Sequence, residues 1–259
     1  FAAGMAASGL KPVVAIYSTF LQRAYDQIIH DVCLQELPVV FAVDRAGLVG
    51  SDGETHQGIF DTSYLSSIPG LMVLSPKDGR ELREMLIYAY SLNKPVAVRY
   101  PRGMADEFTD IEFKPIKAYE NEVIEKGKNV AVFATGKTVK LALDISKILK
   151  ESKILPTVVN VRFLDKADGD LLKELKDDHW VVAVVEESVR TGSYTERLMA
   201  ESAGLGLGYH FIPVTLPDNY IEQGSVDELW DRYGFNAEVI AEKIKEEALT
   251  KLDDELFRR

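Results

Sequence analysis

The chain has 259 residues, of which 46% are hydrophobic and 27% are charged, and its formal net charge is −11. The acidic balance argues against general nucleic-acid binding, which needs a basic surface, and no apolar run approaches the ~20 residues of a membrane span. Cys33 is the only cysteine, so the sequence excludes an intramolecular disulfide and a cysteine-rich metal site.

The beginning of the chain predicts a helix without a start signal. Phe1–Ser8 is rich in small residues, and Gly9 is a typical helix stop. Because the sequence does not begin with Met, we expect it to start inside an element of a longer protein. No signal peptide is recognisable, and we expect a cytoplasmic location with no membrane or nucleic-acid partner.

Short runs rich in Val and Ile alternate with helical patterns through the first hundred residues. Strands that are apolar on both faces predict a parallel sheet covered by helices. The predicted strands are Pro12–Tyr17, Pro38–Val43, Leu71–Leu74 and Val96–Arg99, and the predicted helices are Thr19–Gln35 and Gly79–Leu92. The carboxyl ends of such strands meet at one edge, where ligands of open sheets bind.

Met104–Glu120 interrupts this alternation with Pro115 and several charges, and a second α/β unit follows. Its predicted strands are Asn129–Ala134, Leu155–Val159, Trp180–Glu186 and His210–Val214, and its predicted helices are Thr138–Lys150, Tyr194–Ala203, Val226–Tyr233 and Ala237–Lys251. We therefore predict a two-domain α/β chain, with domains at 1–108 and 121–259 and a linker at 109–120.

The first polar cluster at a predicted strand end is Tyr17–Arg23. Thr19 and Gln22 have the spacing of a capping box, which predicts that a helix begins there. A helix N-terminus beside the aromatic residues Tyr17 and Phe20 suits a flat heterocycle or an anion. An ordinary cap with two core aromatics is the alternative.

The second cluster is a glycine-rich loop that begins at Asp44 and Arg45, directly after an apolar strand. Four glycines lie between positions 47 and 58, so the backbone can approach a ligand closely. The loop also contains Asp52 and His56, and a histidine in such a loop suits general acid–base catalysis. A solvated loop with an incidental histidine is the alternative.

The third cluster, Val98–Gly103, follows the last predicted strand of the first domain. Arg45 and Arg102 both leave strands at the same edge, and two guanidinium groups that converge there can clamp a phosphate. Pairing of these arginines with nearby acidic residues is the alternative. In the second domain, Glu186 and Glu187 are interpreted as a solvated turn, and a functional role is the alternative.

Four motifs, in order along the chain, resemble the 1-deoxy-D-xylulose-5-phosphate synthase family. They are Tyr-Ser-Thr-Phe-Leu-Gln-Arg from Tyr17, Asp-Arg-Ala-Gly-Leu-Val-Gly-Ser-Asp-Gly-Glu-Thr-His-Gln-Gly from Asp44, Arg-Tyr-Pro-Arg-Gly from Arg99 and Leu-Pro-Asp-Asn-Tyr-Ile-Glu-Gln-Gly-Ser from Leu216. The Thr-His-Gln triplet is shared with transketolases, but the two long motifs together are specific.

The resemblance implies a three-domain homodimeric protein. Residues 1–102 match its parallel-sheet pyrimidine-binding domain, and residues 129–252 match its transketolase C-terminal-type domain. The N-terminal domain, which would bind the diphosphate and Mg²⁺ through a G-D-G…N motif, has no counterpart in this sequence. A glutamate in an A-E-Q-H motif would lie just upstream of Phe1, so we expect this chain to be inactive alone.

The resemblance also implies thiamine diphosphate as cofactor and a reaction that yields isoprenoid precursors. Pyruvate is decarboxylated and its two-carbon unit is joined to D-glyceraldehyde 3-phosphate. For the cofactor, the implied roles are stacking of Phe20 on the aminopyrimidine ring and lining of that pocket by Arg23. The cofactor is the electron sink, and the protein supplies orientation and electrostatics.

For the substrates, the resemblance implies that Tyr17, Arg45 and Arg102 hold the phosphate end of the aldehyde. Asp52 and His56 are implied to contact the pyruvate-derived intermediate and to manage protons. Two alternatives stay open. The chain can be a naturally separate subunit, either of a split transketolase or the β-subunit of a 2-oxo acid dehydrogenase. It can also be a non-catalytic dimerisation fragment.

Overall fold

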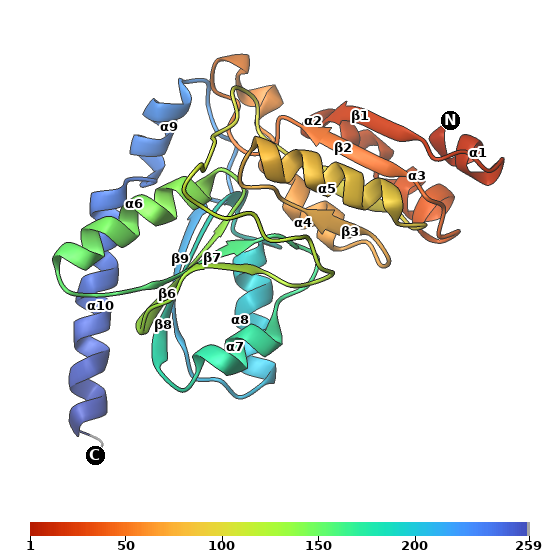
Figure 1. Ribbon diagram of the computed structural model, residues 1–259. Coiled ribbons are helices and arrows are strands. Elements are labelled where there is room, and N and C mark those ends of the chain that lie inside the picture. The colour runs from red at the N-terminus through yellow and green to blue at the C-terminus, as the bar shows by residue number, and fades with distance from the viewer. Residues whose placement is uncertain (258–259) are drawn as a thin grey trace.

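The computed structural model describes residues 1–257, and the side chains of residues 1–250; the last two residues of the predicted 121–259 domain lie outside the described part. Two separate sheets, each with helices packed against it, follow one another along the chain (Figure 1). The predicted two-domain α/β architecture is therefore confirmed.

The first domain is built on a four-stranded, fully parallel sheet in the order β1-β2-β4-β3. Its strands are β1 (Val13–Tyr17), β2 (Val40–Asp44), β3 (Met72–Leu74) and β4 (Val96–Arg99). Short helices α1 (Ala2–Ala7) and α4 (Asp61–Ser66) and the long helix α5 (Gly79–Ser91) accompany them. In the central strands, the consecutive apolar residues that predicted burial on both faces are indeed buried.

The predicted helix Thr19–Gln35 is confirmed as a helical segment from Ser18 to Cys33, but it is irregular. The segment divides into α2 (Ser18–Leu21), a 3₁₀ turn η1 (Gln22–Ala24), α3 (Tyr25–Gln27) and a π-helical segment η2 (Ile28–Cys33). The predicted capping box is wrong. Helix α2 begins directly after Tyr17, so Thr19 lies inside the first turn, and its buried Oγ1 has no hydrogen-bond partner among the described residues.

The second domain has a five-stranded sheet in the order β5-β7-β6-β8-β9. Its strands are β5 (Glu122–Glu125), β6 (Asn129–Thr135), β7 (Thr157–Val161), β8 (His179–Val189) and β9 (His210–Leu216). Its helices are α6 (Thr138–Glu151), α7 (Gly169–Leu175), α8 (Tyr194–Gly204), α9 (Val226–Tyr233) and α10 (Ala237–Phe257). The antiparallel edge strand β5 and helix α7 were not predicted from the sequence.

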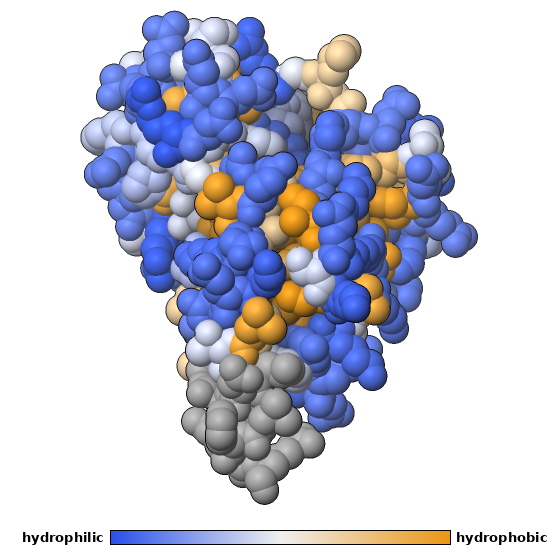
Figure 2. Space-filling model, turned by 90° about the vertical axis from the view of Figure 1, so that its left-hand side faces the viewer, coloured by the Kyte–Doolittle hydropathy of each residue, from blue (hydrophilic) through white to orange (hydrophobic). Residues whose placement is uncertain are grey.

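Helices cover both faces of the second sheet, with α6 and α10 on one face and α7 and α8 on the other (Figure 1). Hydrophilic side chains cover most of the surface that α6, α9 and α10 form, and apolar side chains show between them (Figure 2). The core beside α8 continues into the first domain, where Phe41 and Leu65 join the same cluster as Phe133 and Leu198. Within the described residues, no helix is long and apolar enough to cross a membrane.

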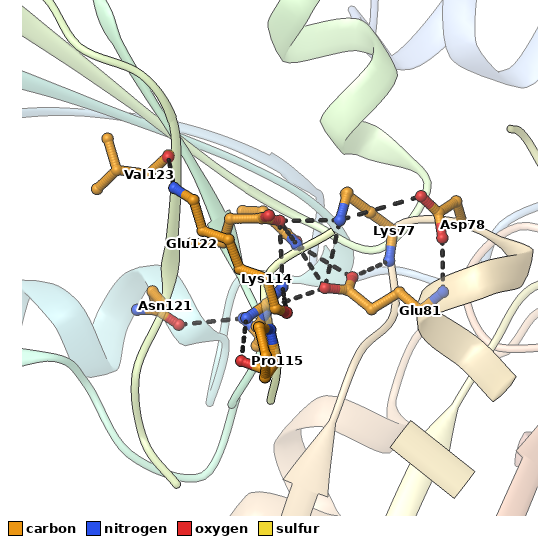
Figure 3. Close-up of polar contacts among 10 residues, drawn as sticks. Lys77, Asp78, Glu81, Lys114, Pro115, Asn121, Glu122 and Val123 are labelled. Carbon is orange, nitrogen blue, oxygen red and sulfur yellow. Dashed lines mark hydrogen bonds and ion pairs between the residues drawn. The ribbon is translucent and has the colours of Figure 1, made fainter. Parts of the chain in front are cut away.

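A buried group of ionic side chains joins the two domains (Figure 3). Lys77 and Glu81 belong to the first domain, whereas Glu122, Asn160 and Arg162 belong to the second. The Lys77 ammonium lies 2.8 Å from Glu122, and Arg162 donates to Glu81 at 2.7 Å. Asn160 donates to both carboxylates. Each charge therefore has a partner on the other domain.

The balance of this group explains the ionisation of Glu122. Burial alone would raise the pKa of its carboxyl, but the hydrogen bond from Lys77 and the charge of Arg162 more than offset this and hold the pKa below its ordinary value. Loss of one partner would leave the other charge buried and unpaired. The network thus favours a single relative orientation of the two domains.

Candidate active site

The polar clusters that follow β1, β2 and β4 meet at the carboxyl edge of the first sheet. Tyr17 ends β1, Arg45 follows β2, and Arg102 follows β4. The chain after Arg45 forms a loop that returns at Gly58 and carries Asp52 and His56. Parallel pairing of β1 with β2 and of β2 with β4 is what brings these distant segments together.

Three ring side chains form one wall of the site. The Tyr17 and Phe20 rings stack, with centroids 5.1 Å apart. His56 meets Phe20 edge-on at a centroid distance of 5.5 Å, and its Nδ1 lies 3.0 Å from the Oγ1 of Thr55. Phe20 is half exposed, at 50%. The flat ring of a ligand can therefore stack on the exposed face of Phe20.

Two arginines converge beside this wall. Arg45 lies over the Tyr17 ring, 4.1 Å from its centroid, and donates to the Tyr17 hydroxyl at 3.0 Å. Both Arg45 and Arg102 form ion pairs with Asp52, and the Arg102 pair is 2.8 Å long. The two arginines thus meet at one place, and a carboxylate of the chain itself, Asp52, occupies it, which is the alternative that the sequence left open.

The backbone that presents Arg45 is unusual. Arg45 has a φ of 60°, the left-handed region that costs energy for any residue with a Cβ. Just beyond it, Gly47 and Gly58 exchange two backbone hydrogen bonds, at 2.7 and 2.8 Å, and close the loop. A Cβ on Gly58 would overlap the carbonyl oxygen of Arg45. The loop therefore requires glycine at its point of closure.

A buried ion pair supports this edge from below. Arg99 forms two hydrogen bonds with Asp61, both 3.0 Å long, and both side chains are buried. Burial would lower the pKa of Arg99, but Asp61 and then the carboxylates of Glu186 and Glu187 raise it above its ordinary value. The end of β4 is thus tied to the start of α4. No pattern in the sequence indicated this pair.

The interpretation of Glu186 and Glu187 as a solvated turn is wrong. Strand β8 continues to Val189, and the two glutamates are only 1% and 4% exposed. Each carboxylate has its own donors. Glu186 accepts hydrogen bonds from the backbone and hydroxyl of Thr195, and Glu187 pairs with Lys137. Val189 continues the apolar pattern after Glu186, Glu187 and Ser188, and this is the signal in the sequence that the strand is longer than predicted.

Arg23 makes no polar contact with the other predicted site residues within the described part of the chain. It is exposed in η1, and within the described part of the chain no hydrogen bond or ion pair joins it to Tyr17, Phe20 or the loop. A cavity of about 390 Å³ opens next to the arginines, lined in part by Arg45, Arg102 and Lys137. The described residues contain no group of His, Cys, Asp and Glu suited to hold a metal ion.

Both halves of the chain match known domain families. The transketolase pyrimidine-binding domain matches residues 1–106, and the transketolase C-terminal domain matches residues 120–240. The 1-deoxy-D-xylulose-5-phosphate synthase of Dictyoglomus thermophilum is 50% identical over 94% of this chain and 40% of its own length. That of Natranaerobius thermophilus is 47% identical over 94% of this chain and 39% of its own length.

Solved structures show the same fold. A split-gene transketolase, described as an inactive beta4 tetramer, superposes with a TM-score of 0.83 at 25% identity, over 96% of this chain and 80% of that one. The transketolase of Campylobacter jejuni gives 0.76 at 19% identity, over 95% of this chain and 37% of that one. The chain spans about two fifths of the length of the curated synthases that it matches.

Proposed function

Since the chain belongs to the transketolase family through both of its domains, we propose that it is the pyrimidine-binding and C-terminal part of a 1-deoxy-D-xylulose-5-phosphate synthase. The single observation that carries the proposal is the convergence of Arg45 and Arg102 beside Tyr17, Phe20 and His56. The whole protein would decarboxylate pyruvate and join the remaining two carbons to D-glyceraldehyde 3-phosphate. We place the domains at 1–108 and 121–259.

The proposed cofactor is thiamine diphosphate, which when bound supplies the carbanion chemistry that side chains cannot. The residues present fit its aminopyrimidine ring, because Phe20 offers a half-exposed aromatic face at the sheet edge. Ser18 and Thr19 also have buried hydroxyl groups there without a hydrogen-bond partner in the described residues. Arg23 would line the same pocket. Mg²⁺ and the diphosphate would be held by an N-terminal domain, as the resemblance to the synthase family implies.

Tyr17, Arg45 and Arg102 would bind the aldehyde phosphate. A phosphate dianion carries more charge than a carboxylate and accepts bidentate hydrogen bonds from guanidinium groups, so it can replace Asp52 between the two arginines. Asp52 would then be released toward the reacting carbons. The Nδ1 of His56 already faces Thr55 at 3.0 Å, which leaves its Nε2 to exchange a proton with the intermediate.

A second candidate function is that of a separately encoded transketolase subunit. The split-gene transketolase chain is covered to 80% by this one, so a natural polypeptide of similar extent has the same fold. The synthase-type motifs at Tyr17 and Asp44 favour the first proposal, since the synthases of the two thermophiles are about twice as similar in sequence. A homodimer is a further part of the proposal and rests on the resemblance; a cytoplasmic location is another part and rests on the expectation from the sequence.

The choice of donor substrate tests the proposal. The natural protein is purified from its source, and its full length is checked by intact-mass measurement. In the presence of thiamine diphosphate and Mg²⁺, it should form product from pyruvate and D-glyceraldehyde 3-phosphate. It should not use a ketose phosphate as donor. Turnover of a ketose phosphate without pyruvate would identify a transketolase instead. The 259-residue chain alone should give no product with either donor.

A further inference from the structure

A buried carboxylate of the second domain reaches into the first. Glu187 lies on β8 and is only 4% exposed. Its Oε2 accepts a hydrogen bond from the backbone N–H of Leu48 at 3.3 Å. Its Oε1 lies 2.9 Å from the Lys137 ammonium and accepts a hydrogen bond from the Trp230 indole. Three groups from distant parts of the chain thus meet at one side chain.

The contact between Glu187 and Leu48 lies near the start of the loop that carries the proposed catalytic residues. Leu48 follows Gly47, whose pairing with Gly58 closes that loop. Gly47 has a φ of 77°, and a Cβ there would overlap Oε2 of Glu187. Both the backbone conformation and the missing side chain are therefore needed for this close approach.

The rest of the loop is also held from the second domain. Val189 donates to the carbonyl of Ile59 at 3.1 Å, just past the loop. Gln223 donates to the carbonyl of Ser51 at 3.1 Å, next to Asp52. Among these contacts, the one from Glu187 is buried and charged, and a charged acceptor makes the stronger hydrogen bond.

We propose that Glu187 is a positioning residue, which holds the 45–58 loop so that Arg45, Asp52 and His56 keep their places at the sheet edge. This inference rests on the proposed function. Without the carboxylate, the buried Leu48 N–H loses its acceptor and Lys137 loses its partner, and a buried donor without a partner is unfavourable. The loop then opens more often, although no group that contacts substrate has been removed.

Glu186 provides a matched control. It is the adjacent residue on β8 and is 1% exposed. Its carboxylate accepts hydrogen bonds from Tyr194, Thr195 and Ser188, all of them in the second domain. Glu186→Ala therefore removes an equally buried carboxylate from the same strand without removing a hydrogen bond to the loop. Both glutamates also raise the pKa of Arg99, so the comparison isolates the contact with Leu48.

The test compares Glu187→Ala, Glu187→Gln and Glu186→Ala in the complete natural protein. Two quantities are measured: hydrogen exchange of a peptide that covers residues 45–59, and kcat and KM for both substrates. We expect exchange in this peptide about tenfold faster, and kcat about tenfold lower, for Glu187→Ala alone. Glu187→Gln, which keeps an oxygen acceptor for Leu48 but turns its NH2 group toward the donors Lys137 and Trp230, should recover only part of the protection and activity.

The inference is overturned if Glu187→Ala and Glu186→Ala give the same exchange in the loop and the same kinetics, since both would then act only through stability. If Glu187→Ala does not fold, Glu187→Leu replaces it, because it fills the same space without an acceptor for the Leu48 N–H. The exchange measurement needs no turnover. It therefore stands even if the natural protein fails to use pyruvate, which would refute the proposed function separately.

Discussion

Arg45 contacts Tyr17 in two ways at once, through its guanidinium over the ring at 4.1 Å and through a hydrogen bond to the hydroxyl at 3.0 Å. The ring fixes the distance of the guanidinium from the ring plane, and the hydrogen bond to the hydroxyl fixes the rotation of the guanidinium. The tyrosine therefore holds Arg45 in the orientation in which it pairs with Asp52.

The first prediction concerns Tyr17→Phe in the complete protein, which keeps the stacked ring and removes only the hydroxyl. Loss of one hydrogen bond to a charged group should raise KM for D-glyceraldehyde 3-phosphate about fivefold or more, equivalent to ~1 kcal/mol, and leave KM for pyruvate unchanged. Steady-state kinetics with each substrate varied in turn measures this. A change confined to pyruvate would contradict the assignment of Tyr17 to the phosphate.

The second prediction concerns the two arginines of the clamp. Arg45→Ala and Arg102→Ala should each raise KM for the phosphorylated aldehyde by about 10- to 100-fold, because each removes a charge-assisted contact. The effect on pyruvate should be much smaller. Arg83→Ala, on the exposed face of α5, is the matched control and should behave as wild type. An equal effect on both substrates would argue against the clamp.

The third prediction concerns His56→Ala, which should lower kcat about 10²- to 10⁴-fold, the usual contribution of a general acid–base group. The melting temperature should stay within a few degrees of wild type, because His56 is only partly buried in a surface loop. His30→Ala is the control, since His30 is exposed and pairs with Asp26. Unchanged turnover would exclude the proposed role of His56.

The fourth prediction concerns Glu81, which is fully buried between Arg162 and Lys77. Glu81→Ala should destabilise the chain by ~3–5 kcal/mol, because it leaves two cations buried with too few partners. Arg83→Ala on the same helix should change stability by less than ~0.5 kcal/mol. Urea unfolding of the 259-residue chain measures both. Similar midpoints for the two variants would refute the role assigned to the network.

The fifth prediction follows from Glu122, whose pKa lies below its ordinary value of 4.5. A lowered folded-state pKa contributes stability that is fully present above the unfolded-state pKa and is lost as the pH falls through the folded-state pKa. The stability difference between wild type and Glu122→Gln should therefore be largest near neutrality and shrink below about pH 4. A difference that grows with acid would show that the carboxylate is not stabilised by its partners.

Continuous apolar strands were the easiest elements to predict. Val96–Arg99 has the predicted bounds, because consecutive Val and Ala residues fit only a strand that is buried on both faces. Strand β5 was missed, since Glu122 and Glu125 make it look like a polar linker. Its Glu122 is buried only because Lys77 and Arg162 meet it in the folded chain.

The candidate site, like the fold, could be predicted only in part. The resemblance to the synthases is confirmed at the level of the whole chain, and the motifs indicated which residues gather at the sheet edge. Pairing of the arginines with an acidic residue was an open alternative, but the motifs could not indicate that Asp52 pairs with both of them, because this depends on the loop conformation. They also could not reveal Glu187, because its partners are distant in the sequence. Leu48 and Lys137 lie 50 residues or more away from it, and Trp230 lies almost as far. The roles of the seven site residues stay predictions.

The buried network at the domain boundary limits how this chain can be recombined with its relatives. Lys77 and Glu81 lie before the linker, and Glu122, Asn160 and Arg162 lie after it. A chimera that joins the first half of one homologue to the second half of another is viable only if both parents keep matching charges at these positions. For protein engineering, the two domains should therefore be exchanged together as one unit, even though each is built on its own sheet.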